Sequence, residues 1–187
     1  HRSDPSRTQS RPPVQYAAPL VPADGNRGGS KQMRIFGFAG WSGSGKTTLI
    51  EQVIPRLVRR GLSVSLIKHA HHRFEFDQPG KDSYRHRHAG CSEVLVTSGT
   101  RWALMHELRG GPELSLDEAL ARLSPCDLAL VEGYKAHPIP KLEIWRAEVG
   151  KSLLHPRDPQ ILAIATDSPE ALPPGTAGRM PVFALSD

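Results

Sequence analysis

The chain of 187 residues is 38% hydrophobic and 23% charged, an ordinary composition for one globular domain with a sizeable core. Residues 1–32 hold five Arg or Lys against two Asp, so +3 of the net charge of +5 lies there, and the remaining +2 is too small to indicate nucleic-acid binding. No apolar run approaches the ~20 residues of a membrane span, and Cys91 and Cys126 fit neither a disulfide framework nor a zinc-ligand spacing, so we expect a cytoplasmic protein.

The first 32 residues differ from the rest of the chain. They contain five prolines, scattered Ser and Arg, and almost no apolar periodicity. Such a segment cannot bury enough apolar surface to offset the entropy lost on ordering, so we predict a disordered, Pro/Arg-rich tail over residues 1–32. The folded domain is expected to span residues 33–187.

Apolar periodicity predicts alternating strands and helices over the folded part. The predicted strands are 35–39, 62–68, 93–97, 101–106, 127–131, 142–146, 161–165 and 182–185, and the predicted helices are 47–60, 83–89 and 116–123. Asp82 or Ser83 is expected to cap the second helix and Ser115 the third, while Pro55 should bend the first. This order predicts an α/β fold whose twisted, mostly parallel sheet is flanked by helices, with a β-hairpin extension at 93–106.

The turn between the first strand and the first helix matches the P-loop (Walker A) pattern G-x-x-x-x-G-K-T. Gly43 and Gly45 let the backbone curl so that successive N–H groups face an anion, Lys46 can bind the β/γ-phosphates, and the Thr47 hydroxyl can ligate Mg²⁺. The predicted nucleotide-binding residues are Gly40, Ser42, Gly43, Ser44, Gly45, Lys46, Thr47 and Thr48. We therefore expect a P-loop NTPase-like three-layer sandwich over residues 33–187 that binds a nucleoside triphosphate with Mg²⁺.

Three further carboxylates have positions that suit nucleotide chemistry. Glu132 ends an apolar strand, where P-loop proteins place a Walker B acid, so it is predicted to hold Mg²⁺ with Thr47, although it could simply cap the strand. Glu132 and Asp77 are also the candidates for the acid that activates water. Asp167 follows another buried strand, where it could accept the N1 and N2 hydrogens of guanine or serve as a turn residue before Pro169.

Histidines gather in the two segments 69–72 and 86–88. Their spacing would suit a zinc site, but Lys68, Arg73, Arg85 and Arg87 lie among them, and cations oppose the binding of a divalent metal. We therefore interpret these segments as an electropositive collar for phosphate groups.

Several motifs together resemble the family of molybdopterin-guanine dinucleotide biosynthesis adapter proteins (MobB), over residues 34 to about 187. They are Ala39–Leu49, Ile67-Lys68-His69-x-His71-His72, Asp77-x-Pro79-Gly80-Lys81-Asp82-Ser83, Arg87-x-Ala89-Gly90, Arg101–Leu104, Leu130–Lys135 and Pro140–Ile144. The resemblance implies a dimeric GTP-binding protein with weak intrinsic GTPase activity, which assists the nucleotidyltransferase MobA in attaching GMP to molybdopterin. It further suggests contact with molybdopterin or a molybdoenzyme.

One rival function is a small P-loop kinase that phosphorylates a small-molecule acceptor. Arg73, Arg85 or Arg87 could supply the arginine that such an enzyme places over the phosphates, but the sequence shows no clear acceptor site. Since no water-positioning Gln or arginine finger is identifiable either, we expect at most a slow GTPase. Trp41 occupies the position at which the deviant P-loops of partition and nitrogenase-iron ATPases carry a lysine, so their intermonomer lysine mechanism is not expected.

Overall fold

The computed structural model of the protein describes residues 33–70 and 74–185. The predicted tail, together with His71, His72 and Arg73, lies outside these residues. The strands are β1 (Arg34–Ala39), β2 (Val64–Lys68), β3 (Glu93–Thr97), β4 (Trp102–His106), β5 (Leu128–Glu132), β6 (Lys141–Trp145), β7 (Ile161–Thr166) and β8 (Val182–Ala184). The helices are α1 (Lys46–Arg59), α2 (Asp82–His88) and α3 (Leu116–Leu120), and short 3₁₀ turns are η1 (Ala147–Val149), η2 (His155–Arg157) and η3 (Pro169–Ala171).

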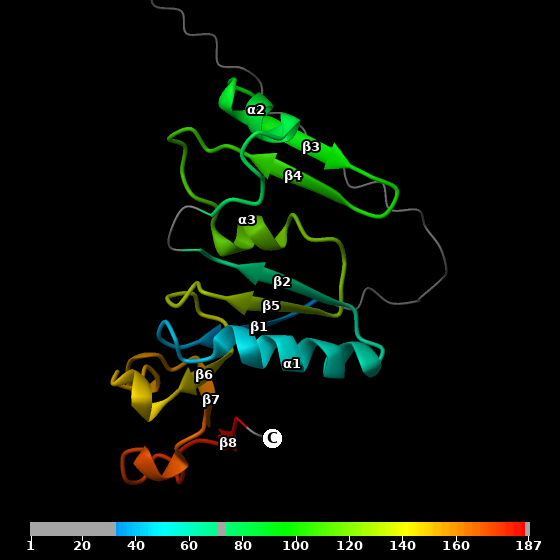
Figure 1. Ribbon diagram of the computed structural model, residues 1–187. Helices are drawn as coiled ribbons and strands as arrows, with labels where there is room; N and C mark the ends of the chain where they lie inside the picture. Colours follow the sequence, from blue (N-terminus) through cyan, green and yellow to red (C-terminus); the bar gives the residue numbers. More distant parts are fainter. Residues whose placement is uncertain (1–32, 71–73, 186–187) are drawn as a thin grey trace, which may run out of the picture. The chain divides into compact units, whose positions relative to one another are not determined.

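Six strands form one sheet in the order β2-β5-β1-β6-β7-β8, and every neighbouring pair is parallel (Figure 1). Parallel strands need crossover connections, and α1 connects β1 to β2, which lies on the far side of β5. Because all six strands point the same way, the loops that leave their carboxyl ends gather along one edge of the sheet, where α/β proteins bind ligands.

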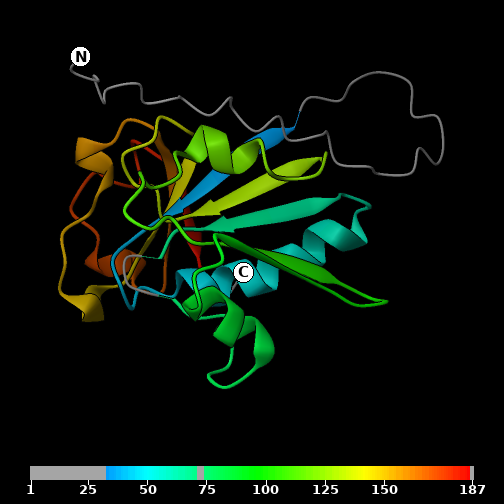
Figure 2. The ribbon, with the colours of Figure 1, turned by 90° about the horizontal axis from the view of Figure 1, so that it is seen from above.

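Helices cover both faces of this sheet, as Figure 2 shows for α1 and α3. On the α1 face, Phe38, Ile50, Leu130 and Ile144 form a buried cluster, and on the α3 face a second cluster joins Leu116 and Leu120 to Ala129 and Val131 of β5. The predicted three-layer α/β fold is thus confirmed. No helix within residues 33–70 and 74–185 is long and apolar enough to cross a membrane.

The helix ends agree only in part with the expected caps. Ser115 caps α3 through a full capping box, in which its hydroxyl accepts from the Glu118 N–H and the Glu118 carboxylate accepts from the Ser115 N–H. The cap position of α2 is Lys81, so the expected Asp82 or Ser83 cap is wrong; Asp82 instead begins the helix, where a carboxylate complements the helix dipole. Helix α1 continues through Pro55.

The predicted hairpin is a separate antiparallel sheet made of β3 and β4, with Glu93 opposite His106 and Thr97 opposite Trp102. Its apolar side chains are unusually exposed: Trp102 is 70% exposed and Leu95 58%. A two-stranded sheet has no second layer of its own, and α2 packs against β3.

Candidate nucleotide site

The P-loop sits at the end of β1, whose last residues Phe38 and Ala39 are almost fully buried. Gly40 has φ 150°, and a Cβ there would lie 2.6 Å from both the Ile144 carbonyl oxygen and the Ser44 Oγ, so no other residue fits. Gly45 lies at the N-cap of α1 in the left-handed conformation, which turns the chain directly into the helix. The loop therefore packs against β6 and presents the N-terminus of α1 to a ligand, as phosphate sites require.

The Lys46 ammonium donates to two carbonyls of the same loop, those of Gly40 (3.1 Å) and Trp41 (2.8 Å). Its pKa is lowered chiefly by burial; Glu132 opposes this shift, and the nearby charges of Lys135 and Lys68 add to it. The charges of three lysines therefore lie close enough to affect one another, and this concentration of positive charge attracts an anion.

Thr47 and Glu132 meet as predicted, with the Thr47 Oγ1 donating to the Glu132 Oε1 at 3.2 Å. The register explains the meeting, because Glu132 at the end of β5 pairs with Phe38 of β1, two residues before the P-loop. Glu132 is 7% exposed, and its other oxygen lies 3.4 Å from the Lys68 Nζ. A hydroxyl and a carboxylate side by side are the hard oxygen donors that Mg²⁺ prefers, so these residues fit that ion.

Ser44 gives an independent indication of a binding site. Its side chain is 1% exposed, and its Oγ has no hydrogen-bond partner among the described residues. A buried hydroxyl without a partner costs roughly 1–3 kcal/mol, so native structures seldom retain one without a reason. A phosphate oxygen would supply the missing partner.

Arg146 is a site residue that was not predicted from the sequence. It follows β6 directly, and its Nη2 lies 3.3 Å from the position that a Cβ on Gly45 would take, so the guanidinium lies against the P-loop. Its Nε lies 3.3 Å from the Asp167 Oδ2, and its Nη1 lies 3.1 Å from the Glu148 Oε1. Arg146 thereby joins the phosphate-binding loop to the predicted base-reading carboxylate. A basic residue directly after a strand could have indicated this role. Because the predicted strand 142–146 includes Arg146, this indication was missed.

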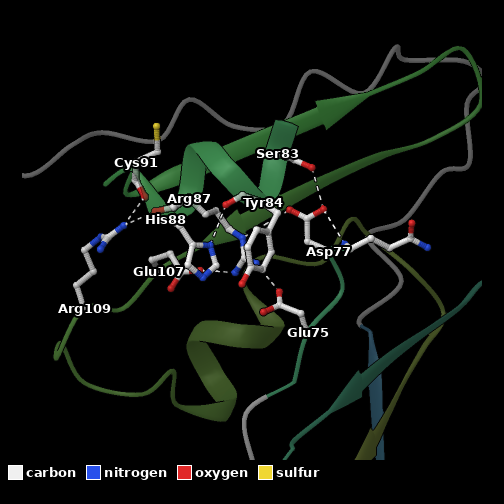
Figure 3. A network of polar contacts seen from close by, with 10 residues as sticks. Glu75, Asp77, Ser83, Tyr84, Arg87, His88, Cys91, Glu107 and Arg109 are labelled. Carbon is white, nitrogen blue, oxygen red and sulfur yellow. Dashed lines mark hydrogen bonds and ion pairs between the residues drawn. The ribbon is translucent and has the colours of Figure 1, made fainter. Parts of the chain in front are cut away.

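Asp77 is held in a different network (Figure 3). Its Oδ1 accepts from the Ser83 hydroxyl at 2.8 Å, and its Oδ2 lies 3.7 Å from the Arg87 Nε. Arg87 also pairs with Glu75 and, at 2.6 Å, with Glu107. These contacts connect the loop before α2 to the residue after β4, so Asp77 helps to hold this loop in place. Its proposed role in activating water stays a prediction.

The same network bears on the electropositive collar and on the kinase hypothesis. The charge of Arg87 is balanced by three carboxylates, and Arg85 lies 3.8 Å from the Asp82 carboxylate on an exposed face. His88 bonds to the Tyr84 carbonyl within α2. Arg85 and Arg87 are therefore paired with carboxylates, which weakens the case for either as a phosphate-covering arginine; Arg73, the third candidate, lies outside the described residues.

His69 marks the end of β2, beside the site. Its Nε2 lies 2.6 Å from the Glu113 Oε1, and its ring packs against Tyr134 with 4.9 Å between centroids. A Cβ on Gly133 would lie 2.6 Å from the His69 Cβ, and φ at Gly133 is 109°, so glycine is required there. Within residues 33–70 and 74–185 no three His, Cys, Asp or Glu side chains are grouped to hold a metal ion.

Comparison with known proteins agrees with this geometry. The family model for MobB, molybdopterin guanine dinucleotide synthesis protein B, matches residues 35–167. The chain is 44% identical to the molybdopterin-guanine dinucleotide biosynthesis adapter protein of Haemophilus influenzae over 142 residues (75% of this chain, 78% of the relative). It is 42% identical to that of Escherichia coli over 146 residues (75% and 82%).

Solved structures give the same result at the level of the fold. The crystal structure of Bacillus subtilis MobB is similar with a TM-score of 0.64 and 26% identity, covering 83% of this chain and 91% of that one. The structure of a MobB homolog from Bacillus stearothermophilus is similar with a TM-score of 0.59 and 28% identity, covering 83% and 90%. The P-loop, the strand order and these relatives agree: the chain belongs to the MobB family.

Proposed function

We propose that this protein is a GTP-binding accessory protein of molybdenum cofactor biosynthesis, which assists the conversion of molybdopterin to molybdopterin guanine dinucleotide. Family membership and the names of its relatives support the pathway. The observation that carries nucleotide binding is the 3.2 Å contact between Thr47 and Glu132, beside the Lys46 ammonium.

Mg²⁺ bound there would neutralise phosphate charge, and Thr47 and Glu132 are the residues that would hold it. Lys46 and the N-terminus of α1 bind and orient the β- and γ-phosphates. The described site contains Arg146 against the P-loop, yet this guanidinium is already paired with Asp167 and Glu148. An arginine held by two carboxylates is not free to stabilise the transition state, which supports slow hydrolysis, so we propose a weak GTPase that presents GTP.

Nucleotide titration calorimetry in Mg²⁺ tests this proposal. GTP is expected to bind in preference to ATP, and Lys46→Ala to abolish binding while the circular dichroism spectrum is unchanged. Arg59→Ala, which removes one positive charge from the far end of the same helix, is the matched control and should bind like the wild type. Equal affinities for GTP and ATP would overturn the guanine assignment.

Asp167 is the proposed reader of the base, placed at the end of β7 and 3.3 Å from Arg146. A carboxylate accepts both the N1 and the N2 hydrogens of guanine, whereas an asparagine amide can donate to the 2-oxo group of xanthine. Asp167→Asn is therefore expected to weaken GTP binding and to strengthen binding of xanthosine triphosphate. If both nucleotides respond equally, Asp167 does not read the base.

The proposed partners are MobA, a second copy of this chain, and molybdopterin or a molybdoenzyme. The accessory role is tested by adding the purified protein to MobA with limiting GTP and measuring formation of the dinucleotide. The wild type should raise the yield and Lys46→Ala should not. Sedimentation equilibrium tests the homodimer, which the exposed apolar side chains of β3 and β4 support; a concentration-independent monomer would contradict it.

A further inference from the structure

A cavity of about 480 Å³ lies beside the end of β6. Trp145, the segment 151–157 and the segment 171–179 form its walls, and it shares no lining residue with the P-loop, Glu132 or Asp167. Its volume is within the range of about 300–1,000 Å³ that small-molecule sites occupy. The cavity is therefore separate from the nucleotide site described above.

The charge of the lining is one-sided. Lys151, His155, Arg157 and Arg179 line the cavity, and no acidic residue does. Among residues 33–70 and 74–185, no carboxylate pairs with Lys151, Arg157 or Arg179, unlike Arg87 and Arg146, which have carboxylate partners. His155 differs, because its Nδ1 lies 3.7 Å from the Glu143 Oε2. Three cations without a carboxylate partner around one hollow attract an anion.

The segment that carries Lys151, His155 and Arg157 is anchored to β6 by hydrogen bonds. Glu143 is 0% exposed, and its two oxygens accept from the backbone N–H groups of Leu154 (2.6 Å) and His155 (2.9 Å). The Trp145 indole N–H donates to the Lys151 carbonyl at 2.8 Å. Burying a carboxyl group is costly in free energy, and the two backbone hydrogen bonds offset part of that cost while they fix the loop at residues 154 and 155. A preorganised wall of this kind lowers the entropy lost on ligand binding.

The cavity also contacts the P-loop through one side chain. The indole N–H of Trp41, the residue after Gly40, donates to the Ser152 carbonyl at 2.8 Å. The ammonium of Lys151, a cavity residue, lies 6.0 Å from the Trp41 ring centroid, and that of Lys135 lies 4.9 Å away. A shift of the P-loop would therefore reach the cavity wall.

We propose that this cavity is a second ligand site, which takes a small phosphorylated compound with a planar ring. Arg157, Arg179 and Lys151 bind the phosphate, while Trp145 and the rigid prolines Pro156 and Pro173 supply flat apolar walls for the ring. The site itself stands on the cavity alone; its coupling to the P-loop rests on the proposed function. The hydrogen bond from Trp41 to Ser152 then links the two sites.

Binding of flavin mononucleotide to the full chain, followed by fluorescence, tests the site, with riboflavin as the same ring without phosphate. Flavin mononucleotide should bind saturably and at least tenfold more tightly than riboflavin, and inorganic phosphate should compete with it. Arg157→Gln together with Arg179→Gln should weaken the binding of flavin mononucleotide by roughly tenfold or more, because that is the loss in affinity expected when a charge-assisted hydrogen bond is removed. The matched control, Arg59→Gln with Arg101→Gln, removes the same charge elsewhere and should change nothing.

The result that overturns the proposal is equal binding of the two flavins, no saturable binding up to millimolar probe, or no effect of the Arg157/Arg179 pair. Loss of flavin mononucleotide binding in Lys46→Ala would also overturn it, because the cavity would then be part of the nucleotide site. If the wild type fails to bind GTP, the proposed function fails while the flavin result still decides the cavity.

A separate variant, Trp41→Phe, tests the coupling between the cavity and the P-loop. Trp41→Phe keeps a ring but removes the N–H that reaches the Ser152 carbonyl. In the wild type, saturating GTP should change the flavin mononucleotide affinity severalfold, and by linkage the flavin should change the GTP affinity by the same factor. Trp41→Phe should bring both factors close to one; unchanged factors would show that Trp41 does not join the sites.

Discussion

Strands β5 and β3 have similar sequences and opposite surroundings. β5 reads Leu-Ala-Leu-Val-Glu and is buried at four of its five residues, whereas β3 reads Glu-Val-Leu-Val-Thr and is exposed at four of five. β5 lies between β2 and β1 with helices over both faces, and β3 has a single neighbour, β4. An apolar run therefore predicts a strand, while the neighbours of that strand decide whether it belongs to the core.

The largest effect is expected in β5. Leu130 is 1% exposed and packs in the cluster under α1, so Leu130→Ala removes buried methyl groups and leaves a cavity. Such changes cost about 2–5 kcal/mol of unfolding free energy. Urea denaturation measures the loss; a change below about 1 kcal/mol would mean that the site collapses around the smaller residue.

The next largest effect is expected at Glu143 of β6, an acid that is fully buried, unlike Glu93 of the hairpin. Burial raises the pKa of Glu143 above its ordinary value of 4.5, against the opposing bonds from Leu154 and His155. Between pH 4.5 and that raised pKa the folded state holds a proton that the unfolded state has lost, so the unfolding free energy falls as pH rises through this window. A tenfold difference in proton affinity between the two states corresponds to about 1.4 kcal/mol.

Thermal melts between pH 4 and pH 8 should therefore show a shallower decline in Glu143→Gln than in the wild type. Glu170→Gln, at an exposed position of η3, is the control and should keep the wild-type slope. Identical slopes in all three proteins would show that Glu143 is ionised throughout at no cost.

A smaller effect is expected for the cross-strand pair of the hairpin. The Glu93 Oε1 lies 2.7 Å from the His106 Nδ1, and the two residues are directly opposite in the register. Exposed ion pairs contribute about 0.2–1 kcal/mol and weaken with salt. A double-mutant cycle with Glu93→Ala and His106→Ala should give a coupling within that range, and a coupling of several kcal/mol would show that the pair is buried in solution.

The weakest response is expected at Leu95, the hairpin counterpart of Leu130. Leu95→Ala in β3 removes the same atoms as Leu130→Ala in β5, but Leu95 is 58% exposed, so the unfolding free energy should change by at most about 0.5 kcal/mol. The measurement is made at protein concentrations where sedimentation shows a monomer. A loss as large as that at Leu130 would mean that another part of the same chain covers Leu95 in solution.

Features that depend on residues close together in the sequence could be predicted from the sequence alone. The glycines, lysine and threonine of the P-loop act within one turn, and the strand-end rule placed Glu132 beside Thr47 because the sheet is parallel. Every predicted strand and helix is present. The predicted cap of α2 was wrong. Asp82 and Ser83 are both residue types that favour the N-cap position, but the helix begins earlier, with Lys81 at the cap. The sequence does not fix the start of a helix to within one residue.

Features that depend on sheet order were not predictable. Arg146 reaches the P-loop because β6 lies beside β1, a neighbour that the sequence does not identify. Asp77 is held by Arg87, which in turn pairs with Glu107, 20 residues away on the other side of the hairpin. Pairings of this range are set by tertiary packing, and spacing along the chain carries no signal for them.

The contact between His69 and Gly133 makes the ends of β2 and β5 one mechanical unit. The His69 N–H donates to the Glu132 carbonyl at 2.8 Å, and the missing side chain of Gly133 leaves room for the His69 Cβ. A larger residue at position 133 would displace His69 and, with it, the backbone that holds the Glu132 carboxylate against Thr47.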